Sequence, residues 1–240
     1  DCCAQMLDRG WDDDPTWRTR GLEAARRAIE LDPRRPEGHK ARAVLWQIAR
    51  QPAPPIESLE RALACGPRYI PPLINLAYEH LSGGDFAAAE QMLRRAVMSD
   101  PAYGLGHLML AALFIYTRRY REAIAACHRA QIAGESPFHA SHAYAMRAQA
   151  LVALGDRAGA RSEIEGGRAA GLSPRMLNAA EALLEAHDGD AGRARWLLEN
   201  LDREPPGESY GCEIAAAAAG RLGEATLAAR MVAAAERLQQ

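Results

Sequence analysis

Two histidines three residues apart, His139 and His142, are the first candidates for chemistry in this chain of 240 residues. On a helix they would share one face and reach the same metal ion. Glu135 is the nearest third ligand, but Gly134 and Pro137 interrupt a helix around it. We therefore expect loop and helix-start histidines and no metal site. The other histidines are isolated and are expected in a groove or on the surface: His39, His80, His107, His128 and His187.

Nucleophilic and redox chemistry finds little support in the sequence. The five cysteines include no CxxC pair, and we interpret the adjacent Cys2 and Cys3 as buried residues of a helix. Reduced thiols of this kind favour a cytoplasmic location. The patterns GxSxG, HExxH and GxxxxGK[ST] do not occur, and a solvated acidic turn explains the carboxylates at 12–14. The sequence therefore predicts a protein that is not an enzyme and has no cofactor.

Charge is balanced along the chain, with a formal net charge of −2. Residues 1–120 carry 16 basic and 15 acidic side chains, and residues 121–240 carry 13 and 16. Neither half has the basic excess that attracts a phosphate backbone, so we expect no direct nucleic-acid binding. No apolar run approaches the ~20 residues that cross a bilayer. The segment is therefore expected not to enter a membrane.

A repeat dominates the organisation of the chain. Pro33, Pro67 and Pro101 are 34 residues apart, and each follows a run with apolar residues at helical spacing. A fixed period of this length is typical of stacked helix–turn–helix units. Alanine, the best helix former, is abundant, and strand-like runs of Val, Ile and Thr are missing. The period thus predicts helix pairs that bury their apolar faces against neighbouring pairs.

Small residues continue this register toward the C-terminus. Small side chains at fixed positions let antiparallel helices pack closely, so we expect these alanines in helix contacts. One step in the series is 37 residues, and we expect its three extra residues within 134–140, where Gly and Pro would break a helix. The alanines are Ala89 and Ala123, then Ala160, Ala194 and Ala228.

Turn signals separate the helices at the expected places. Gly-Asp at 84–85, 155–156 and 189–190 predicts a turn and an N-cap between the two helices of a pair. Asp-Pro at 32–33 and 100–101 predicts the end of a second helix, because proline disfavours helical geometry in the residue before it.

These patterns together predict an all-α fold, a right-handed α-solenoid of stacked antiparallel helix pairs that forms one domain over residues 1–240. Residues 1–33 are expected to form a degenerate leading unit. Regular helix pairs are predicted near 36–67, 70–101, 104–135, 141–172, 175–204 and 209–238.

Residues 75–101 and 109–130 resemble tetratricopeptide repeats. The matching features are the Leu-Ala pairs at 76–77 and 110–111, the Gly-Asp-aromatic turn, the alanine of the second helix and the closing Asp-Pro. The resemblance covers about 36–240. It implies a superhelix whose concave face, lined by the first helix of each pair, binds protein segments.

Some residues depart from the pattern of this family. Arg42, Arg147 and Glu181 stand where the family usually has an apolar residue, and QPAPP at 51–55 replaces the usual turn of the first regular unit. We expect the helix register to be least regular around these positions.

The whole chain also resembles the C-terminal repeat regions of bacterial signalling proteins. In that group the repeats follow a nucleotide cyclase, a winged-helix regulator or a Ser/Thr kinase domain, and the segments 10–33 and 208–229 look similar. Of the 29 basic residues only Lys40 is lysine, which we interpret as GC-rich codon usage in a bacterium. The chain starts at Asp1 rather than Met, so we expect a piece of a longer protein.

The resemblance places a binding groove on three successive first helices. It would present an apolar strip with tyrosine and amide edges, suited to a segment with aliphatic anchors. The alternative is that some of these residues pack against a neighbouring superhelical turn or a missing domain. The groove residues are Ile74, Tyr78, Leu81, Leu105, Leu108, Ala112, Ile115, Tyr116, His142, Ala145, Gln149 and Val152.

We therefore expect a non-enzymatic scaffold that binds a protein or peptide in this groove. The alternative function is a regulatory module that contacts another domain of the same full-length chain. Binding of a chaperone's C-terminal tail is disfavoured. Lys40 and Asn75 fit the clamp for such tails, but Val44, Leu105 and Met109 replace its other polar groups.

Overall fold

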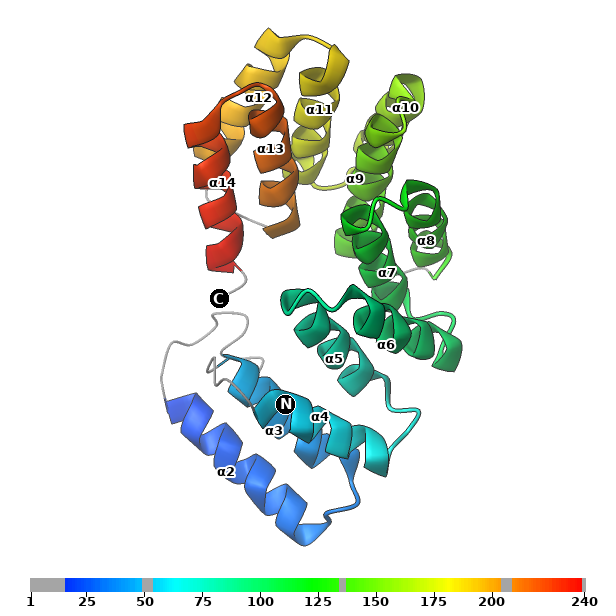
Figure 1. Ribbon diagram of the computed structural model, residues 1–240, viewed down its shortest axis with the longest axis vertical. Helices are drawn as coiled ribbons and strands as arrows, with labels where there is room; N and C mark the ends of the chain where they lie inside the picture. The colour runs from blue at the N-terminus through cyan, green and yellow to red at the C-terminus, as the bar shows by residue number, and fades with distance from the viewer. Residues whose placement is uncertain (1–15, 49–53, 134–136, 204–208, 239–240) are drawn as a thin grey trace. The chain divides into compact units, whose positions relative to one another are not determined.

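The computed structural model describes residues 16–48, 54–133, 137–203 and 209–238, which fold into α-helices joined by short turns (Figure 1). No strand occurs among these residues. The predicted all-α class is therefore confirmed. The helices are α2 (Thr16–Leu31), α3 (Pro36–Ile48), α4 (Pro54–Cys65), α5 (Ile70–Ser82), α6 (Phe86–Ser99), α7 (Gly104–Tyr116), α8 (Tyr120–Ile132), α9 (Pro137–Ala153), α10 (Arg157–Ala169), α11 (Pro174–Asp188), α12 (Ala191–Arg203), α13 (Ser209–Arg221) and α14 (Ala225–Leu238).

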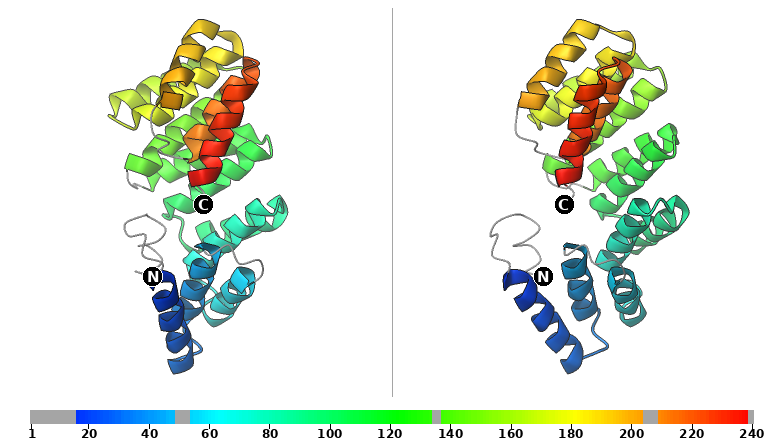
Figure 2. Two further views of the ribbon diagram at one scale, coloured as in Figure 1. Left: turned by 90° about the vertical axis from the view of Figure 1, so that its left-hand side faces the viewer. Right: turned by 60° about the vertical axis from the view of Figure 1, so that its left-hand side comes forward.

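The chain divides into two compact units, residues 1–100 and 101–240. In the N-terminal unit α2 packs on α3, and α3–α4 and α5–α6 form helix pairs. In the C-terminal unit the pairs are α7–α8, α9–α10, α11–α12 and α13–α14. The first helices of these four pairs pack on one another in the order α7, α9, α11, α13 (Figures 1 and 2). Each unit is thus a stack of helix pairs, and one domain over the whole chain stays a prediction.

Aspartates at the predicted turns begin the second helices. Asp85 accepts a hydrogen bond from the Ala88 N–H at 3.0 Å, and Asp156 accepts one from the Gly159 N–H at 2.8 Å. Asp190 accepts from the N–H groups two and three residues on, at 2.8 and 3.0 Å. Each carboxylate satisfies a donor that the helix itself leaves unpaired. The N-caps predicted from Gly-Asp are confirmed.

Helix α9 already includes residues 137–140, part of the segment in which a break between helices was expected. It begins at Pro137, because proline suits the first helical position, where no backbone N–H is needed. It has 17 residues, whereas α7 has 13. One additional helical turn therefore accommodates the three extra residues of the repeat. His139 and His142 lie in the first two turns of this helix.

Alanines at the predicted register are buried in the helix packing. Ala89, Ala123, Ala160 and Ala194 have no exposed surface, as their spacing indicated. Ala228, the last of the series, is half-buried on α14, and no described helix follows to cover it. The repeat therefore marks the sites where a larger side chain would push two helices apart.

Two histidines expected in a groove or on the surface are instead buried. His39 and His107 are 7% and 5% exposed, and each ring Nε2 lies 3.0 Å from a proline carbonyl oxygen, of Pro33 and Pro101 respectively. The 34-residue period had placed these prolines at equivalent positions, and the histidines follow each by six residues. These proline carbonyl groups lie just past the ends of α2 and α6, and the histidine rings are their hydrogen-bond partners. Their role is structural.

The polar residues that depart from the family pattern are buried or half-buried and have hydrogen-bond partners. Arg147 is 2% exposed, and its Nη2 donates to Glu163 Oε2 at 2.6 Å on the second helix of its own pair. Its guanidinium also stacks on the Tyr144 ring, 4.5 Å from the centroid. Arg42 donates to Ser58 Oγ at 3.1 Å in the equivalent geometry. Polar bridges thus replace apolar contacts between the two helices of these pairs.

We expect Arg147→Ala to lower the free energy of unfolding by about 3 kcal/mol, because the Glu163 carboxylate then lies partly buried without its cation. Urea denaturation followed by circular dichroism measures this. The control Arg147→Leu/Glu163→Leu removes both charges and restores an apolar pair, so it should stay within about 1 kcal/mol of the parent. If Arg147→Ala were as stable as the double variant, the ion pair would not support the packing.

Candidate functional site

A cleft of about 390 Å³ opens on the face of the C-terminal unit formed by α7, α9, α11 and α13. It lies toward the carboxyl ends of α7, α9 and α11, runs along α13, and includes residues of the turn between α7 and α8. Its walls combine aliphatic, aromatic and charged side chains, which is the composition expected of a binding pocket. Its lining includes Ile115, Tyr116, Arg118, Gln149, Val152, Leu183, His187, Tyr210, Glu213, Ala217 and Arg221.

Two hydrogen bonds connect α13 to helices that lie far away in the sequence. The Tyr116 hydroxyl on α7 donates to Glu213 Oε2 at 2.6 Å. The Tyr210 hydroxyl donates to Gln149 Oε1 on α9 at 2.5 Å. Tyr210 is 8% exposed, and burial, with the nearby Tyr116, raises its pKa well above the ordinary value. Side chains of α13 therefore cover part of the strip formed by α7 and α9.

The residues predicted for the groove have different environments. On α7, Tyr116 is 50% exposed, Leu105 and Ala112 are half-buried, and Leu108 and Ile115 are buried. On α9, His142 and Gln149 are half-buried, whereas Ala145 and Val152 are buried. The His142 ring lies 6.1 Å from the Tyr210 ring, centroid to centroid. The cleft brings together four residues of the predicted set, Ile115, Tyr116, Gln149 and Val152.

The remaining predicted groove residues belong to α5 in the N-terminal unit. Ile74 is buried, Leu81 is half-buried and Tyr78 is 44% exposed. Tyr78 is thus the member of this group that its own unit leaves most accessible.

Sequence reasoning missed the part of the cleft that α11, α13 and the α7–α8 turn supply. Leu183, Tyr210, Glu213 and Arg221 lie on helices beyond the three chosen for the groove. One signal was available for Arg118, because this residue stands 34 positions after Gly84 and 37 before Gly155. An arginine therefore occupies a glycine position of the repeat.

The backbone at Arg118 has the left-handed conformation that favours glycine. Its φ is 60°, and it is the single non-glycine residue with positive φ in the described ranges. Gly84, Gly155 and Gly223 hold the same place with φ of 78°, 80° and 75°. The turns share one hydrogen-bond pattern, as in the bond from Arg119 N to Phe114 O at 2.7 Å. A side chain in this conformation costs about 1 kcal/mol.

The positive charges of the cleft have no partner within the described parts of the chain. The guanidinium groups of Arg118 and Arg221 form neither a hydrogen bond nor an ion pair with residues that the structure describes. The neighbouring Arg119, by contrast, donates to Glu122 at 2.6 Å and stacks on the Phe114 ring. The cleft therefore presents two open cationic groups next to aliphatic and tyrosine surface.

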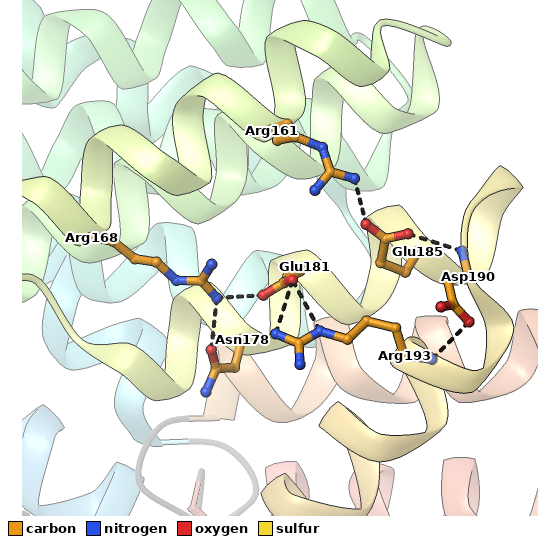
Figure 3. A network of polar contacts seen from close by, with 7 residues as sticks. All are labelled: Arg161, Arg168, Asn178, Glu181, Glu185, Asp190 and Arg193. Atoms are coloured by element: carbon orange, nitrogen blue, oxygen red, sulfur yellow. Dashed lines mark hydrogen bonds and ion pairs between the residues drawn. The ribbon is translucent and has the colours of Figure 1, made fainter.

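Helix α11, which brings Leu183 to the cleft, is held in place by buried carboxylates on another side (Figure 3). Glu181 is 7% exposed and accepts from Arg168 on α10 and, at 3.3 Å, from Arg193 on α12. One turn later Glu185, 6% exposed, accepts from Arg161 on α10 at 2.5 Å. The two carboxylates thus connect three helices.

Glu185 also fixes the turn that follows α11. Its Oε2 accepts from the Asp190 N–H at 2.9 Å (Figure 3). Glycine at 189 leaves the space for this, since a Cβ there would lie 2.1 Å from the same oxygen. Burial opposes ionisation, but the hydrogen bonds from Asp190 and Arg161 outweigh it, so the pKa of the Glu185 carboxyl lies below its usual value.

The described part of the structure offers no candidate residues for metal binding or for thiol chemistry. Among the described residues no three His, Cys, Asp or Glu side chains gather as metal ligands. Cys127 is fully buried, and burial raises the pKa of its thiol to about 12. That environment makes the thiol unreactive. The predictions for Cys2, Cys3, Gly134, Glu135 and the carboxylates at 12–14 concern residues outside the described ranges.

Known proteins share this arrangement of helices. Residues 70–103 match the tetratricopeptide repeat family model, and no curated protein sequence matches the chain. A tetratricopeptide repeat protein from Parabacteroides merdae is similar over 99% of this chain and 94% of its own, with a TM-score of 0.71 and 16% identity. PilF of Pseudomonas aeruginosa is similar over 86% and 90%, with a TM-score of 0.66 and 20% identity.

Yeast Tom70 is also similar, over 95% of this chain and 44% of its own length, with a TM-score of 0.58 and 16% identity. At these identities the likeness shows the fold. The family match identifies residues 70–103 as a tetratricopeptide repeat, and the fold of such repeat proteins extends over the rest of the described chain. None of the described helices has the length and apolar character needed to cross a membrane.

We expect Glu185→Gln to destabilise the fold most at neutral pH. Because its pKa is lower in the folded chain, Glu185 stabilises the fold above the unfolded-state value of about 4.3, and this stabilisation disappears as the pH falls through the folded-state value. The variant should lose about 2 kcal/mol at neutral pH and progressively less below about pH 4. Urea denaturation at neutral pH and below about pH 4 measures the loss of stability. Glu165→Gln, at an exposed position, is the control. Equal losses at both pH values would contradict the assignment.

We expect Arg118→Gly to stabilise the protein, because glycine adopts the left-handed conformation without strain. A gain of about 1 kcal/mol corresponds to a rise in melting temperature of about 2–4 °C. Calorimetry measures it. Gly155→Ala, at the equivalent position with no atom close to the added Cβ, is the control and should lower the melting temperature. A lower melting temperature for Arg118→Gly would mean that the arginine supports the fold.

Proposed function

We propose that this chain is a non-catalytic scaffold whose C-terminal unit binds a protein segment in the cleft between α7, α9, α11 and α13. The observation that carries this proposal is the cleft itself, about 390 Å³ with aliphatic walls at Ile115, Val152 and Leu183. Burial of apolar surface contributes ~25 cal/mol per Å², and a few polar groups then fix the orientation of the ligand. Tyr116 and Gln149 supply such groups at the rim.

The contacts of α13 limit what the cleft can hold. Tyr210 and Glu213 bridge to α9 and α7, so the concave strip is not open along its whole length. A few side chains of an extended segment fit a cavity of this volume, whereas a long amphipathic helix would need the covered part of the strip. The proposed ligand is therefore a short segment with aliphatic anchors.

The source of this segment is part of the proposal. We favour a separate protein. A domain of the same full-length chain is the alternative, as in the bacterial signalling proteins that the sequence resembles. The described cysteines Cys65, Cys127 and Cys212 are unpaired thiols, which supports a reducing compartment such as the cytoplasm.

Selection from random dodecapeptides displayed on phage tests the proposal. Ala217 is exposed on α13 and lines the cleft, so Ala217→Trp fills the cavity without disturbing the core. Peptides selected on the parent protein should bind this variant at least tenfold more weakly in fluorescence anisotropy. Ala158→Trp, at an exposed position of α10 outside the cleft, is the matched control and should bind normally. Equal binding by both tryptophan variants would rule out the cleft as the site.

A further inference from the structure

We propose that the cleft recognises an acidic side chain, Asp or Glu, through the guanidinium groups of Arg118 and Arg221. This inference rests on the proposed function, because it names the chemistry of the segment that the cleft binds. Both arginines line the same cavity, one from the α7–α8 turn and one from the last residue of α13. The two side chains thus come from distant parts of the unit's sequence.

The first observation is that the guanidinium groups of these two arginines are not paired with a described carboxylate. Several other arginines of this unit pair with carboxylates, as Arg161 does with Glu185 and Arg230 with Asp202, at 2.5 and 2.7 Å. Arg118 and Arg221 have no such partner within the described ranges. A guanidinium presents a fork of N–H donors that matches a carboxylate in geometry as well as in charge. Two open forks in one cavity form an anion site.

The backbone at Arg118 is the second, independent observation. The turn requires positive φ there, and equivalent turns use Gly84, Gly155 and Gly223. Arginine occupies the position despite this preference, and its side chain lines the cleft. Strain that the fold does not need is a mark of functional positions. The side chain, rather than the backbone, explains the choice of residue.

The charge of the cleft selects the kind of anion. The cleft holds the guanidinium groups of Arg118 and Arg221, the carboxylate of Glu213 and the imidazole of His187. The two arginines and the one carboxylate together leave a single positive charge in excess. Glu213 stays in the cavity, since it accepts the hydrogen bond of Tyr116. A single carboxylate therefore balances the site, whereas a phosphate group near two charges would meet repulsion from Glu213.

The walls of the cleft favour an acidic residue within a segment over a free chain end. Ile115, Val152 and Leu183 come from three different helices and bound the cavity. A side-chain carboxylate inside a segment has residues before and after it that can contact these walls, whereas a terminal carboxylate has neighbours on one side only. The expected motif is Asp or Glu between aliphatic residues.

The test uses the dodecapeptides selected on the parent protein, synthesised with amidated C-termini. We expect Asp or Glu to be enriched at one position, and its replacement by Asn or Gln to weaken binding at least tenfold in fluorescence anisotropy. Arg118→Gly and Arg221→Gln should each remove most of this difference between the acidic and the amide peptide, as a double-mutant cycle measures. Arg118→Lys keeps the charge and should retain part of the difference. The control Arg129→Gln, exposed on α8, should retain all of it.

The outcomes separate this inference from the proposed function. The selected peptides could bind the parent, lose binding in Ala217→Trp and show no preference for an acidic residue. That result would leave the cleft as the binding site and overturn the proposed recognition of a carboxylate. An acidic preference that persists in both Arg118→Gly and Arg221→Gln would also overturn it. Stronger binding of a phosphoserine peptide, or of a peptide whose single carboxylate is its free C-terminus, would overturn the choice of an acidic side chain. Absence of any bound peptide would refute the proposed function and the inference built on it.

Discussion

Close contact between helices at buried alanines is the constraint on which each unit depends. Ala89, Ala123, Ala160 and Ala194 have no exposed surface, and their period repeats one packing geometry along the chain. Since each pair packs on the next in the same way, the first helices of the C-terminal unit share one face. That repetition brings Tyr210 and Glu213 of α13 within hydrogen-bond distance of α9 and α7. The cleft is a consequence of the stacking.

Polar residues in the core specify how the pairs meet. Arg147 with Glu163 connects the two helices of one pair, whereas Glu181 and Glu185 connect α11 to both α10 and α12 (Figure 3). Apolar surfaces tolerate small shifts, but a charged hydrogen bond is lost within a fraction of an ångström. These bridges therefore orient α11, and with it the Leu183 wall of the cleft.

The sequence was most informative where structure is local. Helical spacing, Gly-Asp turns and the alanine register depend on residues within one repeat, so the all-α class, the N-caps and the buried alanines could be predicted. The cleft depends on the rotation between successive pairs, which no local pattern contains. Leu108 and Ile115 were therefore expected in an open groove but are buried, and Tyr210 was missed although it contacts Gln149 across 61 residues. Arg118 shows that a break in a repeat can point to a candidate functional residue, because its glycine counterparts define what the turn requires.

A crystal structure of the protein with a selected acidic dodecapeptide tests the proposed recognition most directly. We predict the peptide in the cleft between α7, α9, α11 and α13, with one side-chain carboxylate within hydrogen-bond distance of the guanidinium groups of Arg118 and Arg221. Aliphatic neighbours of that residue should contact Ile115, Val152 or Leu183. A peptide bound to another face, or one whose carboxylate points to solvent while both arginines stay unengaged, would contradict this proposal.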